Sequence, residues 1–190
     1  MAQRLRQHIL EALRSGEPVV FGSEAQHDVI TEVLHDLVFV DERDVQRPVM
    51  LRVMYVDGSE AEPFPLFCLS RQAVSLNASL LRVALMSMRH PELDPEIDVC
   101  WFRNRDVSRT RTLAETDSFC YRTTQNQVKD YLKLGALHMH LYHTGFEPAV
   151  IGFYRGIVQA LTSYGLRTRL VVTPFYFRGK QGYQSGRDWS

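Results

Sequence analysis

The chain has 190 residues, of which 45% are hydrophobic and 23% are charged, which suits one packed domain and excludes an intrinsically disordered protein. Lys and Arg together number 22, and so do Asp and Glu, so the formal net charge is zero. This balance argues against a protein whose main task is to neutralise phosphate groups, because such domains are usually strongly basic.

The N-terminal third predicts a helix, a short strand, a second helix and a hairpin. Apolar residues recur every four positions over residues 2–14, and "PVVFG" then forms a short strand. The second helix begins at Ser23, with Gln26 at the spacing of a capping box. Asp57-Gly58, between two alternating apolar segments, predicts the hairpin turn. The outer face of the second helix is acidic and comprises Asp28, Glu32 and Asp36.

The middle of the chain predicts a third helix, a strand and a long loop. The apolar residues of 72–88 recur at helical spacing, and "IDVCWF" is a compact buried strand. Residues 103–127 are polar, rich in Arg and Thr, and show no apolar period before "FCY". A segment of this length without regular structure in a compact domain is usually functional or mobile.

The C-terminal part predicts a strand-helix-strand unit over 134–142, 148–164 and 168–178, followed by an irregular tail over 179–190. The whole order predicts an α/β (or α+β) fold. We expect a single domain over 1–190, with one mixed β-sheet, helices packed on it and a right-handed C-terminal βαβ unit. Gly152 and Gly156 lie four residues apart on the helix, which indicates close backbone packing, on the sheet or else on a partner, with the sheet favoured.

Cysteine usage and hydropathy indicate a cytoplasmic protein. Cys68, Cys100 and Cys120 are an odd number without CxxC spacing, which argues against a disulfide framework. Residues 1–16 carry charges throughout, and no segment approaches the roughly 20 apolar residues that a membrane span needs. Cys68 and Cys100 are expected to act as small apolar residues, whereas Cys120 beside the polar segment could be exposed.

The histidines of "GALHMHLYHTGFEP" predict a metal site. His138 and His140 share the strand face that does not carry the apolar residues, and two imidazoles so placed could hold zinc or another divalent metal. The third ligand would be His143 or a loop carboxylate. Glu147 would complete the site or act as general base. The carboxylates considered in the loop are Glu115 and Asp117.

The same "HMH" is similar to the start of the zinc motif of the JAMM-type isopeptidases. Counting on from His140, Pro148 stands where that family has its serine and Ile151 where it has its acidic ligand. The sequence is therefore not assigned to that family.

A nuclease-like site is a further hypothesis. Glu96 and Asp98 open a strand, and Gln127-x-Lys129 would lie on a neighbouring one. The carboxylates would hold Mg²⁺ and the lysine would assist the attacking water.

Two segments offer contact surface. The arginines of the predicted loop could meet an acidic partner or nucleic acid, and the C-terminal segment mixes aromatic with basic residues, as protein interfaces do. Alternatively, Phe175 and Phe177 face the core while Tyr176 faces water. The candidate interaction residues are Arg103, Arg105, Arg109, Arg111, Tyr176, Arg178, Tyr183 and Trp189.

The sequence shows no complete catalytic constellation, so we expect a non-catalytic protein-interaction or assembly subunit that binds a protein partner or forms a homo-oligomer. The alternative is a metal-dependent hydrolase that uses the His138/His140 pair. The third hypothesis is a nuclease-like or nucleic-acid-binding protein.

Overall fold

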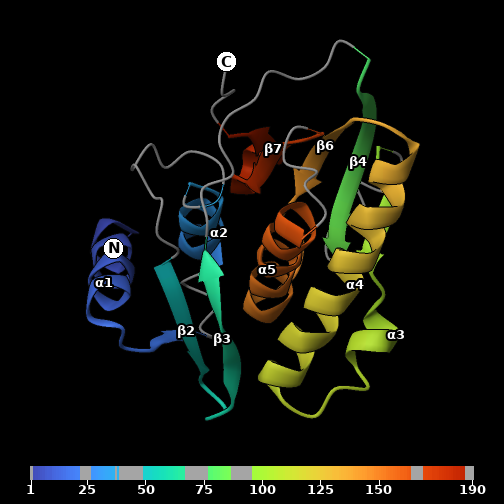
Figure 1. Ribbon diagram of the computed structural model, residues 1–190. Coiled ribbons are helices and arrows are strands. Elements are labelled where there is room, and N and C mark those ends of the chain that lie inside the picture. Colours follow the sequence, from blue (N-terminus) through green and yellow to red (C-terminus); the bar gives the residue numbers. More distant parts are fainter. Residues whose placement is uncertain are drawn as a thin grey trace.

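The computed structural model describes residues 2–21, 27–36, 38, 49–66, 77–86, 96–163 and 169–186. Their strands form two mixed sheets, one of three strands and one of five, which both pack near the central helix α5 (Figure 1). The predicted α/β class and the C-terminal βαβ unit are confirmed. The expected single sheet is replaced by two, because the N-terminal strands pair only with one another among the described residues.

The three-stranded sheet belongs to the N-terminal part of the chain and follows the predicted order. β1 pairs parallel with β2, and β2 pairs antiparallel with β3 around a turn at Gly58, whose φ of 80° favours glycine. The capping box predicted at Ser23 and Gln26 lies outside the described residues. The elements are α1 (Ala2–Ser15), β1 (Val19–Phe21), α2 (His27–His35), β2 (Val49–Tyr55) and β3 (Glu60–Leu66).

The five-stranded sheet has the order β5-β4-β6-β7-β8. Its first four strands run parallel, and β8 is antiparallel to β7. The strands are β4 (Ser79–Met86), β5 (Val99–Phe102), β6 (Leu137–Tyr142), β7 (Leu170–Phe177) and β8 (Tyr183–Ser185).

The helix predicted over 72–88 was wrong for its second half, which is strand β4. β4 lies between β5 and β6, and its residues 83–85 are buried, whereas Ser79 and Leu80 at its start are exposed. Val83 and Leu85 point into the core, and Ala84 is buried on the opposite face. A strand covered on both faces shows a continuous apolar run, which periodicity alone does not distinguish from a helix. Residues 71–76 lie outside the described part.

The loop predicted over 103–127 was also wrong, because most of it is helical. α3 (Asn104–Val107) precedes α4 (Leu113–Leu134), whose N-cap Thr112 accepts a hydrogen bond from the Glu115 amide at 3.1 Å. The buried stripe of α4 repeats about every four residues but is made largely of small or polar side chains, so it shows no apolar period. Its members are Thr116, Asp117, Cys120, Thr124, Val128 and Leu132.

Gly152 and Gly156 allow α5 (Glu147–Ser163) to approach α4, not the sheet as the sequence suggested. A Cβ atom on Gly152 would lie 2.6 Å from the backbone oxygen of Asp117, and one on Gly156 would lie 2.7 Å from that of Tyr121. These distances are shorter than real Cβ contacts, so a larger residue at either position would force the two helices apart.

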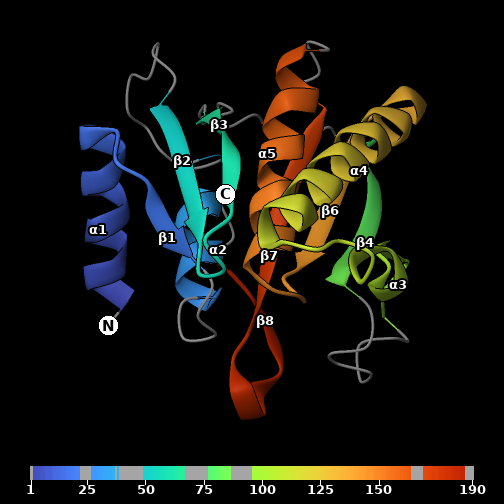
Figure 2. The same cartoon turned by 90° about the horizontal axis from the view of Figure 1, so that it is seen from below.

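α5 is the centre of the molecule, with α4, α2 and strands of both sheets around it (Figures 1 and 2). Nearly every residue of its first four turns is buried, which explains its continuous apolar sequence. No helix in the described part of the chain is both long and apolar enough to cross a membrane.

The tail predicted to be irregular over 179–190 is ordered in its first half. A 3-10 turn, η4 (Gly179–Gln181), connects β7 to β8, and the two strands form a hairpin. Residues 187–190, which include Trp189, lie outside the described residues.

Candidate functional site

His138 and His140 lie side by side on β6, and both are half-buried. Their ring centroids are 4.8 Å apart, and His138 Nε2 lies 2.8 Å from the Thr173 hydroxyl on β7. His143 lies an odd number of positions after His138 and His140, so its side chain points to the other face of the sheet. Its Nε2 lies 2.8 Å from the hydroxyl of Tyr154 in α5. The predicted third imidazole therefore faces the helices, away from the pair.

The carboxylates considered as partners of the histidines are elsewhere. Glu147 is buried in the first turn of α5, past the carboxyl end of β6. Glu115 accepts a hydrogen bond from the Arg111 amide at the start of α4, and Asp117 is enclosed between helices. Within the described ranges, no three His, Cys, Asp or Glu side chains are grouped so that they could hold a metal ion.

The residues predicted to form a nuclease-like site are also not brought together by the fold. Gln127 and Lys129 lie on α4, not on a strand. Asp98 is close to β4, where its Oδ2 accepts a hydrogen bond from the Arg82 amide at 2.7 Å. The acids of 96–98 and the predicted lysine thus do not lie on neighbouring strands.

A row of six rings runs across the face of the five-stranded sheet that carries His138 and His140. Helices α4 and α5 cover the opposite face (Figure 1). Tyr142 and Phe175 stack at 4.6 Å between centroids, and the other contacts range from 4.8 to 5.6 Å. Five of the six side chains keep part of their surface in solvent, while Tyr142 is buried. This aromatic row consists of His138, His140, Tyr142, Phe175, Phe177 and Tyr183.

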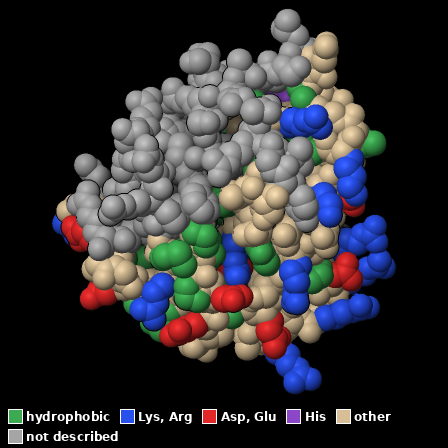
Figure 3. Space-filling model, in the orientation of Figure 1, with side chains coloured by type: hydrophobic (Ala, Val, Ile, Leu, Met, Phe, Trp, Pro, Cys, Tyr) green, Lys and Arg blue, Asp and Glu red, His purple; other side chains and the backbone are tan. Residues whose placement is uncertain are grey.

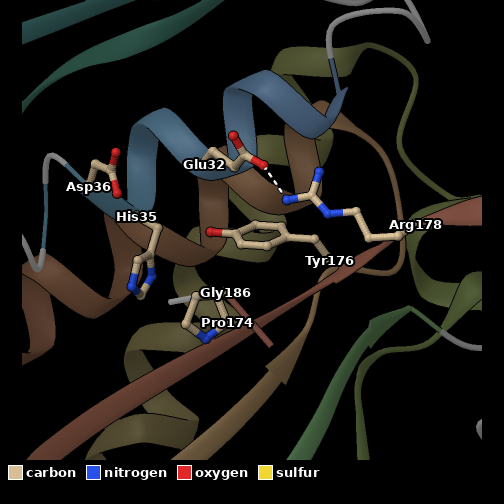
Figure 4. A pocket seen from close by; sticks show the side chains of 7 residues that line it. All are labelled: Glu32, His35, Asp36, Pro174, Tyr176, Arg178 and Gly186. Carbon is tan, nitrogen blue, oxygen red and sulfur yellow. Dashed lines mark hydrogen bonds and ion pairs between the residues drawn. The ribbon is translucent and has the colours of Figure 1, made fainter. Parts of the chain in front are cut away.

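A polar pocket of about 300 Å³ lies between α2 and β7 (Figure 4). Its inner wall is buried, with His35 at 1% and Tyr176 at 5% exposure. Its rim is half-exposed and holds an ion pair, Arg178 Nη2 to Glu32 Oε1 at 2.7 Å. The described residues that line it are Glu32, His35, Asp36, Pro174, Tyr176, Arg178 and Gly186.

Behind the pocket, aromatic and imidazole groups form a continuous buried network. The Tyr154 hydroxyl lies 3.2 Å from His35 Nδ1 and 2.8 Å from His143 Nε2. Because a phenol has one proton, Tyr154 donates to at most one of these imidazoles, and at least one of them donates to it. His143 in turn stacks on Tyr176, with centroids 5.0 Å apart. The network holds the Tyr176 ring in a fixed position in the pocket wall.

Burial determines the protonation of the pocket wall. Desolvation lowers the pKa of His35 to about 3, so its imidazole is neutral at physiological pH. Desolvation raises the pKa of Tyr176, and the Glu32 and Asp36 carboxylates raise it further. The nearby Arg178 guanidinium opposes this rise in the pKa of Tyr176.

A second buried polar group, on the side of α5 that faces α4, connects the two sheets. Arg155 on α5 and Asp117 on α4 form an ion pair at 3.1 Å, and the Tyr55 hydroxyl on β2 donates to Asp117 at 2.8 Å. Desolvation raises the pKa of Asp117, and the Arg155 guanidinium opposes that rise. Arg155 also stacks on Tyr121 and reaches Glu62 at 3.5 Å. Asp117 is fully buried and Arg155 is almost so, and the pair holds α4 and α5 together beside β2.

The predicted interaction residues divide between surface and interior. The four arginines predicted in the loop are exposed, on and around α3, and Arg105 and Arg109 both pair with Asp106. Lys and Arg side chains along the α4 side of the molecule have Asp and Glu among them (Figure 3). Tyr176 is buried in the pocket wall, while the side chains of Phe175 and Phe177 lie on the other face, so the alternative orientation of this strand was wrong.

The remaining residues singled out in the sequence, two in the C-terminal segment and the cysteines, differ in their burial. Arg178 is exposed and Tyr183 is half-buried. Cys120, which could have been exposed beside a loop, is fully buried, and burial raises its pKa. Cys100 is only half-buried, and Cys68 is outside the described residues.

Sequence reasoning missed the pocket. The helical pattern places Glu32 and Asp36 on the acidic outer face of the second helix and does not single out His35, although its imidazole lies between the two acids in the sequence. No model of a known protein family matches the chain, and no curated protein or solved structure is significantly similar to it. The geometry alone therefore carries the functional argument.

Proposed function

We propose that the protein is a non-catalytic assembly subunit that forms a homodimer through its β7–β8 hairpin. The observation that carries this proposal is the position of β8 at the edge of the five-stranded sheet, in a hairpin that extends beyond the rest of the described chain (Figure 2). Gln184 and Ser185 are exposed, and Tyr183 continues the aromatic row to this edge.

The backbone of β8 supports pairing with a second copy. Gly186 donates to the Pro174 carbonyl at 2.7 Å, and Arg178 donates to the Gly182 carbonyl at 2.8 Å. Since hydrogen-bonded and non-bonded pairs alternate along an antiparallel ladder, the backbone of Gln184 faces β7, and the N–H groups of Tyr183 and Ser185 face outward. An edge strand with outward donors and acceptors is a template for another strand.

A two-fold axis at Gln184 would satisfy these groups in both copies. Tyr183 of each chain would then lie opposite Ser185 of the other, and the sheet would continue across the dimer. The hairpin turns, which carry Lys180, would point away from each other, so their positive charges would stay apart. The Tyr183 side chains would extend the aromatic row across the contact.

The test is the mass in solution of the intact chain, measured by sedimentation velocity over a range of concentrations. We expect twice 22.0 kDa for the wild-type protein. Ser185→Pro removes an outward N–H and leaves the groups facing β7 in place, so it should give a monomer. Ser185→Ala, which keeps the N–H, is the matched control and should remain a dimer. A monomeric wild type, or a Ser185→Pro variant that dimerises equally well, would contradict the proposal.

A further inference from the structure

Exposed arginines gather around α3, which follows directly on β5. β5 and β8 form the two opposite edges of the five-stranded sheet, so these arginines are remote from the β8 edge in the sheet order. Basic side chains project along the side of the molecule where α3 and α4 lie (Figure 3). This arginine patch consists of Arg103, Arg105, Arg109, Arg111 and Arg122.

The charges that reach solvent within residues 103–122 are mainly positive. All the arginines of the segment are exposed, whereas of its three acids only Asp106 and Glu115 reach the surface and Asp117 is fully buried. Asp57 comes close from the β2–β3 hairpin, but its carboxylate accepts a hydrogen bond from the first amide of α4 at 2.8 Å. Because the whole chain has a formal net charge of zero, this local positive excess is balanced elsewhere in the sequence.

The protein's own acids hold these arginines only weakly. Arg105 Nε and Arg109 Nη1 lie 3.8 and 4.0 Å from Asp106 Oδ1, and the two arginine side chains are 70% and 79% exposed. Exposed ion pairs contribute about 0–1 kcal/mol, so another anion can replace Asp106 at little cost. The backbone beneath is anchored, because Val107 of α3 is buried in the core.

The composition of the patch favours phosphate groups as the partner. A guanidinium donates two parallel hydrogen bonds to a phosphate. No large apolar side chain of residues 103–122 is exposed, whereas a protein interface usually has an apolar centre. The rings of the segment offer no stacking surface for unpaired bases, because Phe119 packs against the core and Tyr121 lies 4.4 Å from the Arg155 guanidinium. Phosphates of a duplex fit these properties better than an acidic protein or a single strand does.

We propose that the arginine patch binds the phosphate backbone of duplex nucleic acid, without regard to base sequence. The guanidinium groups would pair with neighbouring phosphates, and Arg105 and Arg109 would exchange Asp106 for them. Backbone contacts of this kind position a protein on a duplex and carry no sequence information. The site is separate from the proposed dimer contact at β8, and each copy of the chain carries one patch.

The experiment is fluorescence anisotropy of the intact chain with labelled DNA duplexes of about 12 base pairs, in two unrelated sequences. Both should bind equally, with a dissociation constant below about 100 µM at about 50 mM salt. Each neutralised phosphate contributes about −0.9 to the slope of the logarithm of the binding constant against the logarithm of salt concentration, so three to five contacts predict a slope between about −3 and −4.5.

Three variants connect this binding to the patch. Arg105→Gln should weaken binding and make the salt slope shallower by about one. Arg4→Gln removes an exposed arginine of α1, on the opposite side of the molecule from α3 (Figure 1), and is the matched control that should bind as the wild type does. Asp106→Asn has the opposite expected sign, a several-fold gain in affinity, because it removes the acid that competes with phosphate. Thermal unfolding of each variant separates a lost contact from a lost fold.

The proposal is overturned if the duplex does not bind at about 100 µM protein in about 50 mM salt. It is equally overturned if folded Arg105→Gln keeps the wild-type salt slope or if Asp106→Asn weakens binding. Competition by polyglutamate as effective as that by unlabelled duplex of equal charge would assign the patch to an acidic protein instead. Ser185→Pro should bind the short duplex with an unchanged slope, so failure of the dimer and failure of this site are distinguishable.

Discussion

Stability should fall in mild acid because His35 is buried as a neutral imidazole. Its pKa is lowered from 6.5 to about 3 by desolvation. Between these two values the unfolded chain binds a proton at this position and the folded protein does not, so protonation favours unfolding. The stability that the neutral His35 imidazole provides is complete above 6.5, its pKa in the unfolded chain, and is lost progressively as the pH falls below that value. Linkage gives a loss of about 2 kcal/mol of unfolding free energy on going from about pH 7.5 to about pH 5.

The assay is urea denaturation at both pH values, for the wild type and for His35→Gln. The variant has no imidazole at this position, so its unfolding free energy should change by about 2 kcal/mol less between the two conditions. His8→Gln, which removes an exposed histidine of α1, is the control and should keep the wild-type difference. Equal pH dependence in wild type and His35→Gln would refute the conclusion that His35 is neutral when folded.

Three further predictions concern the packing of α4. Gly156→Ala should lower the unfolding free energy by about 1–3 kcal/mol, opposite to the gain of about 1 kcal/mol expected from helix propensity, because its Cβ would meet α4. Chemical denaturation shows whether the unfolding free energy of this variant falls or rises. Asp117→Asn should cost about 3 kcal/mol by leaving Arg155 without its buried counter-charge, whereas Tyr55→Phe should cost about 1 kcal/mol in the same assay. Thr112→Ala removes the N-cap of α4 and should cost about 1 kcal/mol, read from the thermal midpoint.

The helices and strands could be predicted where a regular apolar pattern is bounded by glycine or proline residues. The hairpin around Gly58 and the βαβ unit have alternating or helical apolar patterns bounded by glycine or proline, and both are confirmed. Over α4 the pattern is hidden, since Thr, Asp and Cys form the stripe that meets Gly152 and Gly156. A signal was present in Thr112 and Glu115, which have the spacing of a capping box.

The candidate site could be predicted less well, because it depends on which distant segments meet. The alternation of side chains along β6 places His138 and His140 on the same face, as predicted, and the same alternation turns His143 away from them. Glu32 and Arg178 are 146 positions apart, and their pairing requires α2 to cross β7. A single sequence contains no periodicity that reports such a contact.

The buried ion pair between Arg155 and Asp117 also affects which parts of the protein unfold together. Tyr55 belongs to the N-terminal sheet, while Asp117 and Arg155 belong to the two helices that cover the other sheet. Opening of the N-terminal sheet alone would take the phenol away from a desolvated carboxylate, a cost that local unfolding normally avoids. Amides of β2 and β6 should therefore exchange their hydrogens in one cooperative unit, although they lie in different sheets.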